Sequence, residues 1–208
     1  PIQWLDLPLV YRLSRRGASL DARLSLTIGD HGLHKALMAG MGQVHTYVLR
    51  SQRGLGFAQL RHVSGQQHAH VAYLAPALDN IVDDGLWLEM LDGLAAMAGQ
   101  REATGLIAEV AENGAGLDVL RRAGFAIYAR QELWRRRPGE APPVTAALRL
   151  ARSEDSIAVM SLYGNLVPGL IQQVESPPMN ANACYVLDGE EGLQALVTAY
   201  RGPAGTLI

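Results

Sequence analysis

One acidic residue of this sequence stands where chemistry is possible. Glu109 lies within the apolar run Leu-Ile-Ala-Glu-Val (106–110), which predicts a short strand inside the fold. A carboxylate on a central strand is costly to bury without a partner, so such a residue is typically functional or well paired. Glu109 is therefore a candidate general base. Because adjacent strand residues point to opposite faces, it could equally lie on a solvated face.

A second group with possible chemistry is Asp83-Asp84-Gly85, directly before a predicted helix. A glycine at a helix N-terminus lets backbone N–H groups approach a phosphate. Asp83 and Asp84 have the wrong charge for that ligand, since a like-charge pair about 4 Å apart costs about 4 kcal/mol even at an effective dielectric near 20. The same aspartates suit a helix N-terminus without any ligand, and we favour this simpler interpretation.

The histidines give no metal site. His68 and His70 alternate on a predicted strand, and His31 and His34 have helical spacing, but neither pair has a third ligand at a suitable distance along the chain. Solvated side chains are the simpler interpretation. Cys184 is the only cysteine, which excludes an intrachain disulfide and a cysteine-based zinc cluster.

These residues are positioned by a regular order of predicted elements. Helices are predicted at 6–16 with Asp6 as N-cap, from about Ser19, and at 31–39, 85–99 and 114–123. Strands are predicted at 44–50 and 55–61 as a hairpin, and at 68–75, 106–110 and 125–136. The order predicts an α/β (α+β) fold, a mixed, mostly antiparallel sheet flanked by helices. The expected apolar face of helix 85–99 is Leu88, Leu91, Leu94, Ala95 and Ala98.

A Pro- and Gly-rich segment at 137–143 predicts a linker, after which a similar order begins again. The later elements are a strand at 148–151, helices at 153–166 and around 171–174, a hairpin of 184–187 with 193–200, and the start of a strand at 205–208. We therefore expect a domain at 1–138, a linker at 139–145 and a second, partial unit at 146–208.

The run 106–110, then Asn113, then Arg-Arg-Ala-Gly-Phe (121–125) resembles the second half of a GNAT acetyltransferase domain, including the eleven residues from Asn to Gly. Gly56-Phe57-Ala58 and Arg-Gln-Glu-Leu-Trp-Arg (130–135) resemble neighbouring strands of that family. The resemblance covers about residues 7–136. It implies acyl transfer from acetyl-CoA to an amine of unknown identity, with Glu109 as general base.

The resemblance also implies a cofactor site. The backbone of Leu74 and Ala75 would pair with pantetheine, Asn113 would hold the pantetheine arm, and Gly85 would belong to the diphosphate loop. The sequence departs from the family at two places. The loop signature falls on Val-Asp-Asp-Gly-Leu-Trp (82–87), where only Gly85 is retained, and Leu120 stands where many members have an acidic Tyr. Tyr73 and Tyr128 lie nearby in the sequence and could substitute for it, although packing is their simpler role.

Three functional hypotheses follow. The first is an acetyl-CoA-dependent N-acyltransferase. The second is a non-catalytic GNAT-like module, an interaction or regulatory half of a tandem protein, with Trp87 filling the cofactor cleft. The tandem is suggested by Leu-Arg-Leu-Ala-Arg-Ser-Glu-Asp (148–155), which resembles the opening of a second GNAT-like unit. The third is an unrelated small-ligand domain.

The composition limits the classes of binding partner that we expect. The chain has 208 residues, 49% hydrophobic and 18% charged, and a formal net charge of −2. No global positive field attracts nucleic acid or an anionic membrane, and no apolar run approaches the length of a membrane span. We expect a cytoplasmic protein without nucleic-acid or membrane partners. Exposed strand edges make a homo-oligomer a further expectation.

Overall fold

The computed structural model describes residues 6–29, 43–81, 83–136, 139, 147–175, 177, 183–190 and 192–208. The chain divides into two compact units, unit 1 (Pro1–Ala126 with Gly202–Gly205) and unit 2 (Ile127–Arg201 with Thr206–Ile208). The predicted helix 31–39 and all of the predicted linker 139–145 except Gly139 lie outside the described residues. The predicted domains 1–138 and 146–208 stay a prediction.

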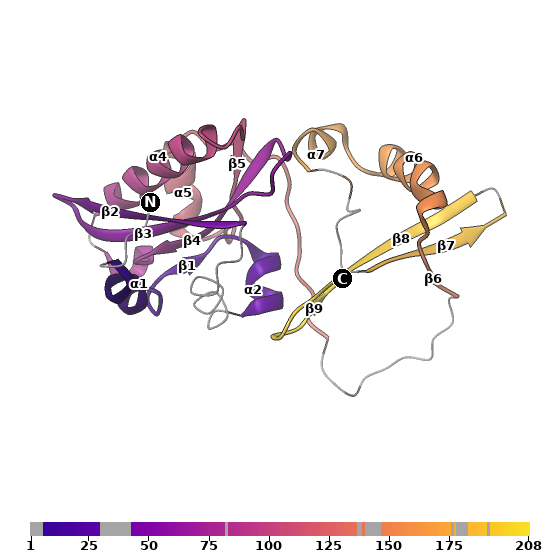
Figure 1. Cartoon of the computed structure of the whole chain (residues 1–208), viewed down its shortest axis with the longest axis horizontal. Coiled ribbons are helices and arrows are strands. Elements are labelled where there is room, and N and C mark those ends of the chain that lie inside the picture. The colour runs from indigo at the N-terminus through magenta and orange to yellow at the C-terminus, as the bar shows by residue number, and fades with distance from the viewer. Residues whose placement is uncertain are drawn as a thin grey trace. The chain divides into compact units, whose positions relative to one another are not determined.

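Unit 1 is a five-stranded sheet with helices on both faces (Figure 1). The strand order is β1 (Ala18–Ser19), β4 (His68–Ala75), β3 (Gly54–Arg61), β2 (Val44–Ser51), and these neighbours are antiparallel. A further strand, β5 (Gly105–Ile107), pairs with β4 in parallel. The expected fold class, a mixed and mostly antiparallel sheet flanked by helices, is therefore confirmed.

The helices of unit 1 divide between the two faces. The α4 helix (Gly85–Gly99) and α5 (Ala115–Arg122) pack on the face that carries Ala58 and Leu60. The α1 helix (Leu7–Leu13) packs on the opposite face, against Phe57, and α2 (Ala22–Ile28) adds Leu24 there. Alternate residues of β3 serve the two faces because strand side chains alternate. A 3-10 turn, η2 (Leu78–Asn80), follows β4.

The predicted hairpin, strand 68–75 and helix 85–99 are confirmed. The predicted buried face of α4, however, is rotated around the helix axis by about one residue relative to the observed buried face. Leu91, Leu94 and Ala98 are buried as predicted, whereas Leu88 is only partly buried and Ala95 is exposed. The helix is apolar around most of its circumference, so periodicity alone left its rotation open. The face toward the sheet consists of Leu86, Trp87, Met90, Leu91, Leu94, Met97 and Ala98.

Several predicted boundaries were wrong. Residues 125–136 contain no strand, and the strand predicted at 106–110 ends at Ile107, so Glu109 lies beyond it. The first helix spans only Leu7–Leu13, and Asp6 makes no capping hydrogen bond because its carboxylate pairs with Arg50. The second helix begins at Ala22 instead of near Ser19, because Ser19 belongs to β1 and Asp21 is the N-cap.

Unit 2 is a smaller antiparallel sheet in the order β6 (Arg149–Leu150), β7 (Ala183–Gly189), β8 (Gly192–Arg201), β9 (Thr206–Leu207). A 3-10 turn, η3 (Ser153–Asp155), leads into α6 (Ser156–Leu166), followed by α7 (Gly169–Val174). The elements predicted after residue 147 are thus confirmed. Across the described ranges, no helix is long and apolar enough to cross a bilayer.

Candidate functional site

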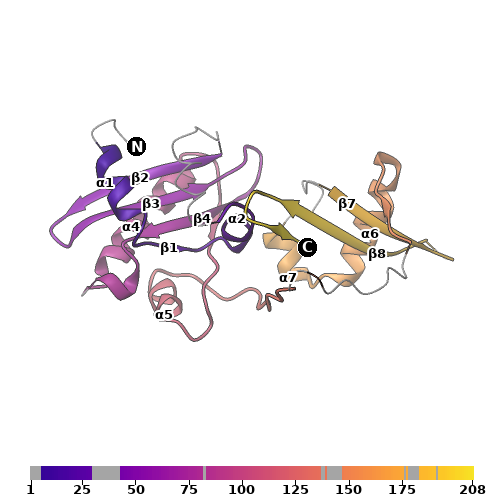
Figure 2. The same ribbon diagram turned by 90° about the horizontal axis from the view of Figure 1, so that it is seen from below.

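The strand β4 changes its neighbour partway along its length. Its first residues, His68–His70, pair in parallel with β5. Further on, Tyr73 and Leu74 pair antiparallel with β1 instead, and Figure 2 shows β1 running beside β4. Beyond His70, β4 therefore no longer pairs with the chain that follows β5, which leaves an opening between them. The segment before α2 lies in this opening.

Leu20 joins the two sides of this opening through its backbone. Its N–H donates to the carbonyl of Ala72 on β4 at 3.1 Å, and its carbonyl accepts from the N–H of Glu109 at 2.9 Å. Its side chain is 1% exposed and belongs to the main hydrophobic core. The segment therefore lies where a further strand between β4 and residue 109 would lie.

Glu109, the predicted general base, is partly buried just beyond β5. Its carboxylate accepts a hydrogen bond from the backbone N–H of Ala22, the first residue of α2. A carboxylate at this place satisfies one of the helix N–H groups that have no partner within the helix. Glu109 thus has a structural partner as well as a position at the opening.

Buried charges surround the same end of α2. Asp21 accepts from the N–H of Leu24 at 2.9 Å and from Nε of Arg61 at 2.7 Å, and the side chains of this ion pair are 1% and 8% exposed. Burial opposes the charge of Asp21, but Arg61 and the Leu24 N–H outweigh it and hold the pKa below its usual value. Burial and the charge of Arg61 lower the pKa of His70 to about 4, so its imidazole is neutral at pH 7.

His70 is thus a partly buried neighbour of an ion pair rather than a solvated strand residue, which corrects the simpler interpretation of the histidine pair. Among the residues that the structure describes, no three histidine, cysteine or acidic side chains are grouped so that they could hold a metal ion.

The N-terminus of α4 is occupied by the chain's own oxygens. The N–H of Gly85 donates to Oδ1 of Asp83 at 2.9 Å. The N–H of Leu86 donates to the carbonyl of Asp83, and the N–H of Trp87 donates to the carbonyl of Asp84 at 3.0 Å. The first N–H groups of a helix are the ones that bind a phosphate. Here these three N–H groups already have acceptors.

The aspartates are also paired with arginines. Asp83 pairs with Arg53, which contacts Glu89 at 3.1 Å as well, and Asp84 pairs with Arg122. The Gly85 hydrogen bond and then that from Arg53 lower the pKa of Asp83, so its carboxylate is charged at neutral pH. Three carboxylates thus face two guanidinium groups, which leaves no positive charge in excess for a diphosphate.

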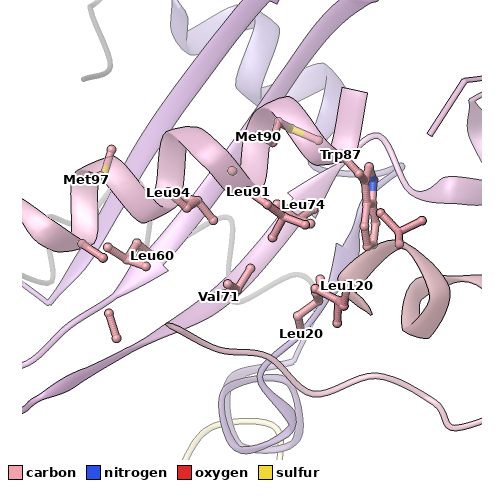
Figure 3. Close-up of a cluster of buried hydrophobic side chains, with 14 of the residues drawn as sticks. Leu20, Leu60, Val71, Leu74, Trp87, Met90, Leu91, Leu94, Met97 and Leu120 are labelled. Carbon is pink, nitrogen blue, oxygen red and sulfur yellow. The ribbon is translucent and has the colours of Figure 1, made fainter. Parts of the chain in front are cut away.

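Trp87 is 2% exposed at the start of α4 and packs in the main core. Its Nε1 donates to the carbonyl of Pro76 at 2.8 Å, directly after β4. Figure 3 shows its indole near Leu74, with Leu20 and Leu120 close together beside it. The space between the start of α4, β4 and α5 is therefore filled by side chains.

The other predicted cofactor residues have these places. The backbone of Leu74 lies between Ala58 of β3 and Ala18 of β1. Ala75, the last residue of β4, pairs with Phe57. Asn113 is exposed in the turn before α5, whose N-cap is Gly114.

Neither tyrosine considered as an acid stands free at the opening. The hydroxyl of Tyr73 donates to the carbonyl of Ser14 at 2.6 Å and accepts from the N–H of Gly17 at 3.1 Å. Tyr128 belongs to unit 2, where its hydroxyl donates to Glu175 at 2.6 Å. Leu120 is 3% exposed and is a core residue.

An acyl-CoA cofactor, which the sequence resemblance implies, does not fit the residues present. Its diphosphate would meet the carboxylates of Asp83 and Asp84 and helix N–H groups that already have acceptors. Its pantetheine arm would compete for the backbone of Leu74 with Ala18 of β1. At the N-terminus of α4 and at Leu74, groups of the chain itself therefore obstruct cofactor binding.

Sequence reasoning identified the unfavourable charge of Asp83 and Asp84 but missed the long-range contacts around the site. Nothing in the sequence pairs Asp21 with Arg61, or Ala18 with Leu74, because the partners are about forty and fifty-six residues apart. One signal was available: Asp21 precedes a helical stretch and is a favourable N-cap residue. The partners of Asp83 and Asp84, Arg53 and Arg122, had no such signal.

No protein-family model matches the chain, and no curated protein matches it. Similar solved structures include the aminoglycoside N-acetyltransferase AAC(6′)-Iy in complex with CoA, at 16% identity and a TM-score of 0.38, covering 51% of this chain and 90% of that chain. Another is the ribosomal-protein-alanine N-acetyltransferase from Brucella melitensis biovar Abortus 2308, at 15% identity and a TM-score of 0.43, covering 64% and 96%. At these values the likeness carries no functional conclusion for this chain.

Proposed function

We propose that unit 1 is a non-catalytic GNAT-like module. It does not bind acetyl-CoA and acts as an interaction or regulatory part of the protein. The occupied N-terminus of α4 carries this proposal. The N–H groups of Gly85, Leu86 and Trp87 all donate to oxygens of Asp83 or Asp84. A ligand diphosphate would have to displace these hydrogen bonds.

Charge supports the same conclusion. Asp83, Asp84 and Glu89 are balanced only in part by Arg53 and Arg122. A bound diphosphate would add negative charge close to these carboxylates, and like-charge repulsion opposes this. Solvent screening at these exposed groups reduces the penalty without changing its sign.

Thermal unfolding of the whole chain with and without millimolar acetyl-CoA tests the proposal. A ligand present at 100 times its dissociation constant stabilises a protein by about 2.7 kcal/mol, which shifts Tm by several degrees. We expect no shift with acetyl-CoA or with CoA. A saturable rise of Tm with both ligands contradicts the proposal.

The second candidate function is acyl transfer from acetyl-CoA to an amine, with Glu109 as general base. The position of Glu109 favours it, because this carboxylate lies next to the place where β4 and β5 stop pairing. Nothing in this candidate identifies the amine.

Glu109→Gln separates the catalytic role of Glu109 from its structural role. A glutamine oxygen can still accept the N–H of Ala22, but an amide cannot accept the proton of an amine. If unit 1 transfers acetyl groups to amines, the variant should lose roughly 100-fold or more in kcat with an unchanged Tm. If unit 1 is non-catalytic, wild type and variant should both release CoA from acetyl-CoA at the background rate with every amine tested.

The remaining expectations about partners belong to this proposal. We propose a cytoplasmic tandem protein without nucleic-acid or membrane partners, and sedimentation of the whole chain would measure its self-association.

A further inference from the structure

The segment before α2 makes the contacts of a short inserted strand. Ala18 and Ser19 pair with Leu74 and Tyr73 of β4, and Ser19 Oγ lies 3.5 Å from the carbonyl of Ala72. One residue further, Leu20 bonds to Ala72 on one side and to Glu109 on the other. The backbone groups that border the opening between β4 and residue 109 are therefore used by the chain itself.

Gly17 fixes the start of this segment beneath a tyrosine ring. The N–H of Gly17 donates to the hydroxyl of Tyr73 at 3.1 Å, and the same hydroxyl donates to Ser14 at 2.6 Å. A Cβ on Gly17 would lie 2.3 Å from Cε1 of Tyr73, whose ring is only 5% exposed. Only glycine therefore fits at this position without moving either the ring or the segment.

The other end of the segment is fixed by buried groups. Leu20 is 1% exposed in the hydrophobic core, and the next residue, Asp21, caps α2 and pairs with Arg61. Glu109 holds the first N–H of the same helix. The segment is thus fixed at both ends by contacts to residues far away in the sequence.

We propose that residues 17–20 are a built-in strand that takes the place of an extended, amide-bearing ligand, the pantetheine arm of an acyl-CoA, between β4 and residue 109. Pantetheine is a chain with two secondary amides, so it needs backbone partners of the same kind as those that Ala18 and Leu20 occupy. This inference rests on the proposed function and adds a second cause, separate from the N-terminus of α4, for the loss of cofactor binding.

Hydrogen exchange of the unmodified chain is the first test, measured by NMR on the amides of Leu20 and Glu109. Both N–H groups donate to carbonyls in a strand-like arrangement, so both should exchange at least about 100-fold more slowly than unstructured amides. Exchange at the unstructured rate for either amide overturns the inference.

Gly17→Ala is the second test, with Gly93→Ala as the matched control. Both changes place a methyl group against a tyrosine ring, Tyr73 at 2.3 Å and Tyr47 at 2.5 Å, but Gly93 is on α4. Gly17→Ala should speed exchange at Leu20 and Glu109 about tenfold or more, as expected when a hydrogen bond is lost. The control should leave both rates unchanged.

The same variants are then titrated with S-acetylpantetheine, a probe that has no diphosphate and so is independent of Asp83 and Asp84. We expect saturable shifts of the Ala72 and Leu74 amides in Gly17→Ala and none in wild type or the control. If Gly17→Ala does not fold, Tyr73→Phe, which removes both hydrogen bonds of the hydroxyl without a clash, replaces it.

The outcomes separate this inference from the proposed function. Binding of S-acetylpantetheine by wild type, or a freed segment that still binds none, overturns the inference and leaves the α4 obstacle intact. Binding of acetyl-CoA by wild type overturns the proposed function, whatever the exchange rates are.

Discussion

The two units of this chain differ most in how they bury apolar side chains. Unit 1 has a continuous core between α4, α5 and the sheet, in which Leu60, Met90 and Leu94 are 0% exposed (Figure 3). Among the described residues of unit 2, the buried hydrophobic side chains are Val159, Val186 and Ala199. On α6, Ile157 is 83% exposed. Because burial of apolar surface is the main stabilising contribution, we infer that unit 1 is the more stable unit.

The two units also differ in how deeply their ion pairs are buried. In unit 1, Asp21 and Arg61 form a buried pair beneath α2. In unit 2, Arg149 of β6 makes paired contacts of 2.6–2.9 Å with Asp155 and Asp188. The side chain of Asp155 is mostly buried, whereas that of Asp188 is more than half exposed. Exposed pairs contribute little to stability, whereas breaking a buried pair is expensive.

The largest expected effect follows from breaking the buried pair in unit 1. Arg61→Met leaves the carboxylate of Asp21 buried without its cation, which should lower the free energy of unfolding by about 3–5 kcal/mol. Urea denaturation followed by tryptophan fluorescence in a Trp134→Phe background measures it, because the remaining tryptophans belong to unit 1. A loss below about 1 kcal/mol would mean that this buried pair contributes no more to stability than an exposed pair does.

A core truncation in unit 1 should be nearly as severe. Leu94→Ala removes a side chain that is 0% exposed between α4 and the sheet, so we expect a loss of about 3 kcal/mol in the same assay. Ile157→Ala is the control in unit 2, where an exposed side chain should change stability by no more than about 0.5 kcal/mol. Its effect is measured by hydrogen exchange of β7 and β8 peptides, because the fluorescence assay reports only on unit 1. Equal losses of stability for the two variants would contradict the inference that unit 1 is the more stable unit.

Acid should weaken unit 1 through His70. Its pKa is about 4 in the folded chain, because of burial and Arg61, and 6.5 ordinarily. Between these values the unfolded state binds more protons, so stability falls as the pH is lowered from about 6.5 to about 4, by on the order of 3 kcal/mol in total. All six histidines precede residue 71, so unit 2 contains none in its range.

The His70→Phe variant checks the assignment. Thermal melts between pH 7 and pH 4.5 should show a smaller loss of Tm for the variant than for wild type. An equal loss would assign the acid sensitivity to another group.

The smallest of these effects is expected in unit 2. Val159→Ala removes two methyl groups from the one buried side chain of α6, which should cost about 2 kcal/mol, from lost burial and the cavity left behind. Hydrogen exchange of β7 and β8 peptides measures it, and β3 and β4 peptides should be unaffected. Faster exchange in both sets would mean that the two units open together.

Local patterns in the sequence predicted much of this fold. The turn at Gly54 predicts the hairpin of β2 and β3, Pro76 marks the end of β4, and the bounds of α4 agree with its apolar periodicity. Each of these signals is contained within about fifteen residues, where backbone preferences and side-chain spacing act directly.

The candidate site was predicted less well. Glu109 was recognised as an unusual carboxylate, but its partner, the N–H of Ala22, is 87 residues away. Residues 125–136 are rich in strand-forming side chains, and yet they form no strand, and none of the strands in the described part of the chain pairs with them. A strand exists only when a neighbour accepts its hydrogen bonds, and the neighbour is not encoded locally.

The sequence by itself therefore determined most elements, the mixed fold class and the unfavourable charge of Asp83 and Asp84 before α4. Only the tertiary structure decided that residues 17–20 lie between β4 and Glu109, and that Asp21 finds Arg61 beneath α2. The reason is physical. Propensity and periodicity act between near neighbours, whereas an inserted strand and a buried ion pair depend on which distant groups the packed sheet brings within hydrogen-bonding distance.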